Sequence, residues 1–389
     1  MKRKRRGRVV ILHLAIAYPF AGVVWQLLHH LIGFRSLGLD VYYFENHGAW
    51  VYDAVRESLV ADPKQNVDTL ARVFKRFGFE DRWAFFDAEH NDYLGMSRER
   101  CDRLLADADV VINLCGATRS RPERRMRCLA YLESDPGALG VAIESKEPRA
   151  LEIAAVHDVF FTYAANLGAS DCRLATGGLK WHRTRPPVVM EEWRREAGGP
   201  APDKFTTVGT WENKGFDVQI AGETYYWSKH VNFRDVLEVA RRAGQPIELA
   251  TNLNSGPDYE RALRGGFTFR PVVPMSLDLD AYRQYIFQSR GEFTVAKDLY
   301  VRTRSGWFSD RSVCYLAAGR PVVTQKTGFE KYVPEGRGLV GFDDADGAVA
   351  AIQRVNADYA GHCRAARESA AEYFDANKVL DEMAEILGL

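Results

Sequence analysis

A segment in the last third of the chain gathers residue types that bind phosphate. Its cationic members are Arg302, Arg304 and Arg311. Guanidinium groups pair with phosphate oxygens through parallel hydrogen bonds. Ser309 or Asp310 can cap a helix here, and Thr327-Gly328 can open a second, shorter one. Since a helix N-terminus offers free N–H groups and a partial positive charge, the segment predicts a diphosphate site.

The sequence favours neither a metal site nor a disulfide framework. Asp278-Leu279-Asp280 resembles a magnesium-binding Asp-x-Asp, but its position favours a helix N-cap. The six cysteines contain no Cys-x-x-Cys pair, so they are expected to be buried free thiols. Their positions are Cys101, Cys115, Cys128, Cys172, Cys314 and Cys363. We therefore expect no metal and no cofactor.

The elements that must position the phosphate-binding residues alternate between strand and helix. The opening predicts a strand at 9–14, a Pro/Gly loop, a helix at 23–37 and a strand at 41–44, which is a βαβ unit. Further strands are expected at 83–87, 110–114, 129–132 and 159–162, with helices at 66–77 and 98–106.

A second alternating series follows a Gly/Pro/Ala-rich stretch at 196–202, which has the composition of a linker. Strands are expected at 205–209, 247–251, 267–272, 292–296, 321–324 and 339–342. Helices are expected at 232–243, 258–263, 279–288, 310–318, 345–356 and within 358–389. The pattern predicts an α/β protein with two doubly wound domains, which place ligand outside the carboxyl ends of their strands.

One motif in this second series resembles a known family. Leu316-Ala317-Ala318-Gly319-Arg320-Pro321-Val322-Val323 is similar to the helix-turn-strand of the nucleotide-sugar-binding region of GT-B glycosyltransferases. Asp310-Arg311 and Leu132-Glu133-Ser134-Asp135-Pro136-Gly137 are closest to the spore-maturation CgeB-like group. The resemblance implies two Rossmann-like domains facing each other across a cleft. It also implies metal-independent sugar transfer from a nucleoside diphosphate sugar to a hydroxyl-bearing acceptor.

The resemblance implies that three regions of the chain have different roles. Residues 1–197 are expected to bind the acceptor and 198–360 the donor. The helices of 361–389 can pack back on the first domain. In the donor domain, Lys214 and Lys297 follow strands where the family contacts donor phosphates, with an exposed turn lysine as the alternative for Lys214.

The chain departs from the family at two positions. Many retaining members carry a pair of glutamates where this chain has Gly306 and Cys314. Asp310 is the nearest acid that can replace a ribose contact. The departure leaves the donor and the stereochemical course, retaining or inverting, open.

In the first domain, the loop after the first strand is where the family brings donor and acceptor together. Gly22 permits close approach to the donor, and Tyr18, Phe20 and Trp25 can stack on an acceptor ring, with core packing as the alternative. Asp135, at another strand end, is also an acceptor candidate.

His47 and Asp53 lie just past the second strand, where either can remove the acceptor's hydroxyl proton if the reaction inverts. Loop hydrogen bonding is the alternative for both, and turn hydrogen bonding is the alternative for Glu133 and Asp135. His13 lies inside the first expected strand, which favours a satisfied core histidine over a base.

Charge leaves the acceptor open. The 52 basic and 52 acidic residues cancel, but residues 2–8 form a basic leader that can touch a polyanion. A lipid, a glycan, a small molecule or a modified nucleobase in DNA all remain acceptors to consider. A non-catalytic nucleotide-sugar-binding protein and a nucleotide-sugar epimerase are alternative functions. The short apolar run at 9–14 predicts no membrane span, and a cytoplasmic protein is expected.

Overall fold

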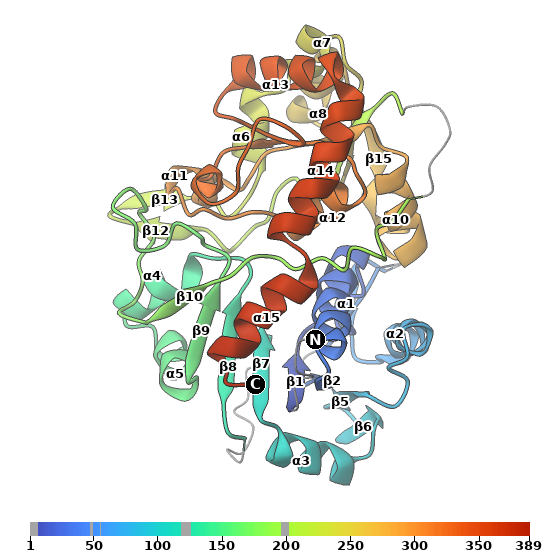
Figure 1. Ribbon diagram of the computed structural model, residues 1–389, viewed down its shortest axis with the longest axis vertical. Coiled ribbons are helices and arrows are strands. Elements are labelled where there is room, and N and C mark those ends of the chain that lie inside the picture. Colours follow the sequence, from blue (N-terminus) through green and yellow to red (C-terminus); the bar gives the residue numbers. More distant parts are fainter. Residues whose placement is uncertain (1–6, 47–49, 55, 118–125, 196–201) are drawn as a thin grey trace.

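Two parallel sheets, stacked one above the other, organise the molecule (Figure 1). This computed structural model describes residues 7–46, 50–54, 56–117, 126–195 and 202–389. The expected linker at 196–202 and the basic leader therefore lie almost entirely outside the described residues. The expected mixed α/β class with doubly wound sheets is confirmed.

The first sheet has eight strands in the order β10-β9-β8-β7-β1-β2-β5-β6. Its strands are β1 Arg8–Leu12, β2 Asp40–Glu45, β5 Trp83–Asp87, β6 Asp92–Gly95, β7 Val110–Leu114, β8 Leu129–Glu133, β9 Val159–Thr162 and β10 Trp181–Arg183. All neighbours pair in parallel except β5 and β6. The central strands are buried on both faces, which is why they read as continuous apolar runs.

The second sheet is parallel throughout, in the order β15-β14-β11-β16-β17-β18. Its strands are β11 Phe205–Val208, β14 Ile247–Thr251, β15 Phe267–Pro271, β16 Gly291–Thr294, β17 Val322–Gln325 and β18 Leu339–Phe342. Two small antiparallel hairpins were not expected from the sequence, since their strands have three residues each. They are β3 Val51–Asp53 with β4 Ser58–Val60, and β12 Val218–Ile220 with β13 Glu223–Tyr225.

Helices flank both sheets. Those of the first part are α1 Ala21–Ser36, α2 Lys64–Arg76, α3 Arg98–Asp107, α4 Ala138–Glu144 and α5 Pro148–Val156. Those of the second part are α6 His230–Asp235, α7 Val239–Ala243, α8 Pro257–Arg264, α9 Val272–Ser276, α10 Leu279–Phe287, α11 Asp298–Arg302, α12 Asp310–Ala317, the 3-10 turn η1 Phe329–Lys331 and α13 Ala345–Ala357.

The single helix expected at 232–243 is instead α6 and α7, separated by a short break. The break has a packing reason. The Leu237 carbonyl oxygen lies 1.6 Å from where a Cβ on Gly265 would be, so the two backbones pass at a distance that only glycine allows. The Gly265 carbonyl then accepts a hydrogen bond from the Arg241 backbone N–H at 2.8 Å.

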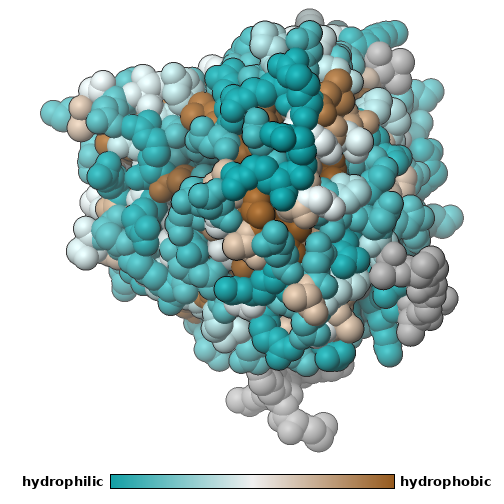
Figure 2. Space-filling view, turned by 90° about the horizontal axis from the view of Figure 1, so that it is seen from above, coloured by the Kyte–Doolittle hydropathy of each residue, from teal (hydrophilic) through white to brown (hydrophobic). Residues whose placement is uncertain are grey.

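The C-terminal helices connect the two halves. Helix α14 (Tyr359–Tyr373) packs on α12 and α15 (Ala376–Ile386) returns to α1 (Figure 1). Gly33 makes the α1–α15 approach close, because a Cβ there would lie 2.4 Å from the Leu380 side chain. The three domain boundaries stay predictions. The face seen from above is mostly hydrophilic, with hydrophobic residues in small separate spots (Figure 2). None of the described helices is long and apolar enough to cross a bilayer.

Candidate functional site

A cavity of about 720 Å³ lies between the two sheets. Its walls include the residues that follow β1, β7, β8, β11 and β16, because parallel strands of each sheet direct their carboxyl ends to the same edge. Eight residues assigned a binding role from the sequence line it: Tyr18, Phe20, Gly22, Trp25, Asp135, Lys297, Asp310 and Arg311.

Arg311, in the first turn of α12, is a buried cation held in place by the second sheet. Its guanidinium donates to the Glu292 carboxylate, to the Val208 carbonyl at 2.6 Å and to Thr294 Oγ1 at 3.0 Å. Burial is the largest single effect and lowers the pKa of Arg311, but Glu292 together with Tyr282 and Tyr315 outweighs it and the pKa rises. Arg311 therefore stays charged beside the cavity.

Lys229 lines the same cavity and was not anticipated from the sequence. It precedes α6, at the end of a long excursion that includes the β12–β13 hairpin. Its ammonium makes no hydrogen bond or ion pair with any described residue. Burial and the neighbouring Arg311 lower the pKa of Lys229 well below its ordinary value, while Glu292 opposes the shift. A cation without a counter-ion at a strand-end cavity is suited to an anionic ligand.

Lys297 joins the two halves of the cavity. Its ammonium lies 2.9 Å from Asp135 Oδ1, which also accepts a 2.5 Å hydrogen bond from the Tyr300 hydroxyl. The ammonium also sits over the Trp227 ring, 3.1 Å from the ring centroid. Burial lowers the pKa of Lys297 and Asp135 raises it, with burial the larger effect.

A hydrogen-bonded chain crosses the cavity through Gln26 of α1. Its Oε1 faces His13 Nε2 at 3.0 Å and the Cys115 thiol at 3.3 Å, and its side chain also hydrogen-bonds Asp310. Burial raises the pKa of Asp310 to about 7; the Gln26 contact opposes the shift and nearby Asp135 adds to it. Near neutral pH, Asp310 is therefore poised between acid and carboxylate.

His13 has a defined tautomer in this chain. Gln26 Oε1 can only accept, so His13 Nε2 carries the hydrogen and Nδ1 carries a lone pair. Nδ1 is buried without a partner among the described residues. Burial lowers the pKa of His13 to about 4, although the Gln26 contact opposes it. His13 was expected to be a core histidine with all its hydrogen bonds made. Among the described residues only one of its two ring nitrogens has a partner, and the residue lines the cavity.

Aromatic side chains form the cavity wall on the side of the first sheet. The Tyr18 and Tyr52 rings stack with their centroids 6.3 Å apart, and the centroids of the Phe20 and Tyr52 rings are 5.4 Å apart. Buried Glu45 shapes this loop, because its carboxylate accepts the backbone N–H groups of Ile16 and Ala17, each at 2.8 Å.

Trp25 combines the binding and packing alternatives. It lines the cavity but is only 1% exposed and packs 5.2 Å from Trp193.

Comparison with known proteins bears on the arrangement of the whole chain. No protein-family model and no curated protein matches the sequence. Solved structures do match. An alpha-glucosyltransferase in complex with UDP-glucose and abasic-site DNA is 12% identical, with a TM-score of 0.57 over 99% of this chain and 100% of that one. AviGT4, a glycosyltransferase involved in avilamycin A biosynthesis, is 12% identical, with a TM-score of 0.56 over 98% and 97% of the two chains.

A third match, sucrose-phosphate synthase from Thermosynechococcus elongatus, is 14% identical with a TM-score of 0.53 over 98% of this chain and 99% of that one. The chain has the GT-B glycosyltransferase fold. The fold expected from the motif at 316–323 is therefore confirmed. The closer resemblance to the CgeB-like group stays a prediction.

Several residues assigned to donor binding lie outside the cavity of this GT-B fold. Lys214 is exposed on a turn. Arg302 instead fastens the β12–β13 hairpin, donating to the Thr224 carbonyl at 2.7 Å and pairing with Glu223. The Thr327 hydroxyl donates to the Trp307 carbonyl, and the Gly328 N–H donates to Glu330 at 3.0 Å, so that N–H is already occupied.

The structure describes one of the two residues proposed as a catalytic base. Asp53 is outside the cavity lining and accepts a 3.0 Å hydrogen bond from the Arg56 backbone. His47 lies outside the described residues. Asp53 is therefore not among the residues gathered around the cavity, and the catalytic roles of Asp53 and His47 stay predictions.

The GT-B fold explains the glycine at the first departure from the family pattern. Gly306 has φ +79°, and a Cβ there would lie 2.4 Å from the Asn166 backbone nitrogen. No side chain fits at this position. At the second position, burial raises the pKa of the Cys314 thiol well above its ordinary value, and the thiol contacts the Asp310 carbonyl at 3.2 Å.

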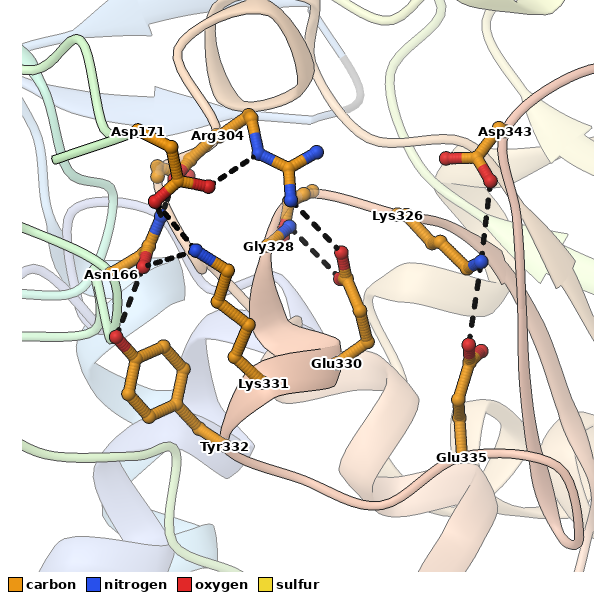
Figure 3. Close-up of polar contacts among 12 residues, drawn as sticks. Asn166, Asp171, Arg304, Lys326, Gly328, Glu330, Lys331, Tyr332, Glu335 and Asp343 are labelled. Carbon is orange, nitrogen blue, oxygen red and sulfur yellow. Dashed lines mark hydrogen bonds and ion pairs between the residues drawn. The ribbon is translucent and has the colours of Figure 1, made fainter. Parts of the chain in front are cut away.

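A polar network holds the two halves together beside the cavity (Figure 3). Asp171, from the loop after β9, pairs with Lys331 at 2.5 Å and with Arg304 at 2.8 Å. Asn166 accepts a 3.0 Å hydrogen bond from the Tyr332 hydroxyl. Hydrogen bonds from Lys331 and Arg304 hold the pKa of Asp171 well below its usual range. These contacts join the loop after β9 to the segment around η1.

Proposed function

We propose that this protein transfers a sugar from a nucleoside diphosphate sugar to a hydroxyl-bearing acceptor, without a metal. The observation that carries the proposal is the cluster of Lys229, Lys297 and Arg311 at one cavity, with the Lys229 ammonium unpaired among the described residues. Such a cluster matches the charge that develops on a diphosphate leaving group, and so it supplies the stabilisation that a divalent cation provides elsewhere.

The donor diphosphate would lie between Lys229 and the N-terminus of α12. Arg311 would contribute through its field and through its remaining N–H groups, since Glu292, Val208 and Thr294 take three of its five donors. The helix N-terminus adds a partial positive charge. Lys297 would hold the sugar-side phosphate or the sugar itself.

The acceptor would enter along the aromatic wall of Tyr18, Phe20 and Tyr52. With the two halves joined, the cavity excludes water and aligns the reacting atoms.

The alternative functions are not favoured. DNA in the matched alpha-glucosyltransferase structure does not carry a DNA acceptor to this chain, because a shared fold does not fix the substrate. A non-catalytic sugar-nucleotide binder or an epimerase gains no support from the comparisons, in which glycosyltransferases recur.

The proposal is tested by a thermal-shift screen against UDP-, GDP-, ADP-, CDP- and dTDP-sugars without added metal. A ligand at about 100 times its Kd should stabilise the fold by roughly 2.7 kcal/mol. The stabilising donor is then incubated alone, and slow release of its nucleotide is measured by chromatography. Failure of every nucleotide sugar to shift the melting temperature would refute the proposal, and binding without release of nucleotide would favour the non-catalytic alternative.

A further inference from the structure

Asp135 presents one occupied and one open carboxylate oxygen. It follows β8 in the first half of the chain, and its side chain is 44% exposed at the cavity. Both donors that reach it, the Lys297 ammonium and the Tyr300 hydroxyl, bind Oδ1. No hydrogen bond from the described residues reaches Oδ2. One oxygen therefore fixes the orientation of the carboxylate and leaves the other free to accept.

The surroundings of the open oxygen suit a sugar. Trp307 lines the same cavity as Asp135. Its indole N–H donates to the Ser134 carbonyl at 2.9 Å, which orients the ring at the cavity wall. Trp227, under the Lys297 ammonium, adds a second ring. Aromatic faces beside a carboxylate oxygen match the apolar face and the hydroxyl groups of a pyranose.

Asp135 is also close to the proposed phosphate site. Its negative charge contributes to the raised pKa of Asp310 in the first turn of α12, and it acts on Lys229 as well. A sugar attached to a diphosphate at Lys229 and α12 would therefore reach Asp135. Gly306 and Cys314 offer no carboxylate for the sugar, and Asp135 supplies one from the opposite half.

We propose that Asp135 Oδ2 accepts a hydrogen bond from a hydroxyl group of the donor sugar and so determines which sugar is bound. The inference rests on the proposed function. It makes recognition of the sugar depend on contact between the halves, because Asp135 comes from one half and the Lys297 and Tyr300 that orient it from the other.

The test compares Asp135→Asn with wild type by isothermal titration, using UDP-glucose and UDP, or the sugar nucleotide and free nucleotide that stabilise wild type most. The amide keeps an oxygen for Lys297 and Tyr300 but places an NH₂ donor where Oδ2 was. UDP affinity should change by less than about threefold, whereas UDP-glucose should bind about tenfold to a hundredfold more weakly, the range for a hydrogen bond to a charged group.

Donors that lack one hydroxyl group complete a double-mutant cycle with Asp135→Asn. UDP-sugars with single deoxy positions should lose affinity for wild type at one position and lose nothing further with Asp135→Asn. Asp102→Asn, the same change on the exposed face of α3, is the control and should leave both affinities unchanged. If Asp135→Asn does not fold, Asp135→Ser enters the same comparison.

Two outcomes overturn the inference. Equal losses for UDP and UDP-glucose would mean that Asp135 acts only by holding Lys297, and an unchanged UDP-glucose affinity would mean that no hydroxyl reaches it. Failure of the proposed function is seen separately, because wild type would then bind no nucleotide sugar in the screen.

Discussion

Lys229 and Arg311 place their cationic groups on the same side of Gly209. A Cβ at Gly209 would lie 3.4 Å from Arg311 Nη1 and 3.9 Å from Lys229 Nζ. Glu292 neutralises Arg311, and no described residue neutralises Lys229. Two cationic groups at one glycine share a single paired carboxylate, so a bound diphosphate would balance their charge and favour the protonated Lys229 ammonium.

Lys229→Met should therefore separate binding from stability. Removing a desolvated cation that has no ion pair costs the fold little and relieves its repulsion with Arg311, so the melting temperature should stay or rise. Donor affinity should fall by about tenfold or more, since a charged hydrogen bond to phosphate contributes about 1.5 to 3 kcal/mol. Calorimetric melting and titration with the donor measure the two effects.

Lys214→Met is the matched control for that experiment. Lys214 precedes Lys229 on the same excursion of the chain but is exposed outside the cavity lining. Its substitution should leave donor affinity and melting unchanged. A loss of donor affinity at Lys214 equal to that at Lys229 would place the phosphates outside the cavity.

Arg311→Met should behave in the opposite way and destabilise the fold. The sequence alone predicts a phosphate ligand at Arg311, which would make donor binding the main loss. The structure changes the expectation, because Glu292 is fully buried and would keep its charge without a partner. Breaking such a pair costs about 3 to 5 kcal/mol.

The double variant Arg311→Met with Glu292→Gln provides the check, because it removes both charges. Chemical denaturation should show that the double variant recovers much of the stability lost in Arg311→Met. No recovery would mean that Arg311 stabilises the fold through Val208 and Thr294 rather than through Glu292.

Cavity residues that directly follow parallel strands were predictable from the sequence, and those in long connections between strands were not. Tyr18, Asp135 and Lys297 each follow an apolar run, and parallel topology brings such positions to one edge. Lys229 follows a hairpin with three-residue strands, which gives too weak a period to place it. A signal was present in Trp227-Ser228-Lys229-His230, where aromatic and cationic residues adjoin a helix start.

The tertiary contacts of charged and polar side chains could not be predicted. Arg302 and Arg304 resembled phosphate ligands because their charge is visible in the sequence, whereas Glu223 and Asp171, which neutralise them, lie far away along the chain. The partnership of His13 with Gln26 likewise depends on the packing of α1 beside β1. Local patterns show which groups carry charge, but tertiary structure determines which of them remain unpaired.

Metal removal should leave the activity unchanged. If Lys229, Lys297 and the α12 N-terminus stabilise the diphosphate, excess EDTA should alter the rate of nucleotide release by less than about twofold, and added Mg²⁺ should not raise it. The measurement is the release rate from the donor identified in the screen, with and without chelator. An EDTA-sensitive rate restored by Mg²⁺ would contradict the metal-independent mechanism.

Asp171→Asn should loosen the contact between halves without unfolding either one. Lys331 and Arg304 would lose their shared carboxylate, so amides at 166–173 and 326–332 should exchange hydrogen faster, and nucleotide release should slow because closure aligns the reacting groups. Hydrogen exchange with mass spectrometry measures this directly. Asp343→Asn is the control, since Asp343 pairs with Lys326 within the second half only (Figure 3). Equal exchange in both variants would contradict an interdomain role for Asp171.

Fold stability and donor affinity should both depend on the protonation of Asp310. Burial raises the pKa of Asp310 to about 7 from its usual 3.8. Between about pH 4 and 7 the folded protein then holds one more proton than the unfolded chain, so the free energy of unfolding falls as pH rises through this window. Glu133 acts with the same sign, because burial also raises its pKa to about 7.

The same ionisation places a negative charge in the first turn of α12, beside the proposed phosphates. If the donor binds only the protonated form, its affinity falls by about tenfold per pH unit above pH 7. UDP-glucose is a suitable probe because its diphosphate does not titrate near neutrality. Titration calorimetry from pH 6 to 9 should show this loss in wild type and a much shallower one in Asp310→Asn. Parallel profiles for the two proteins would show that Asp310 lies outside the field of the bound donor.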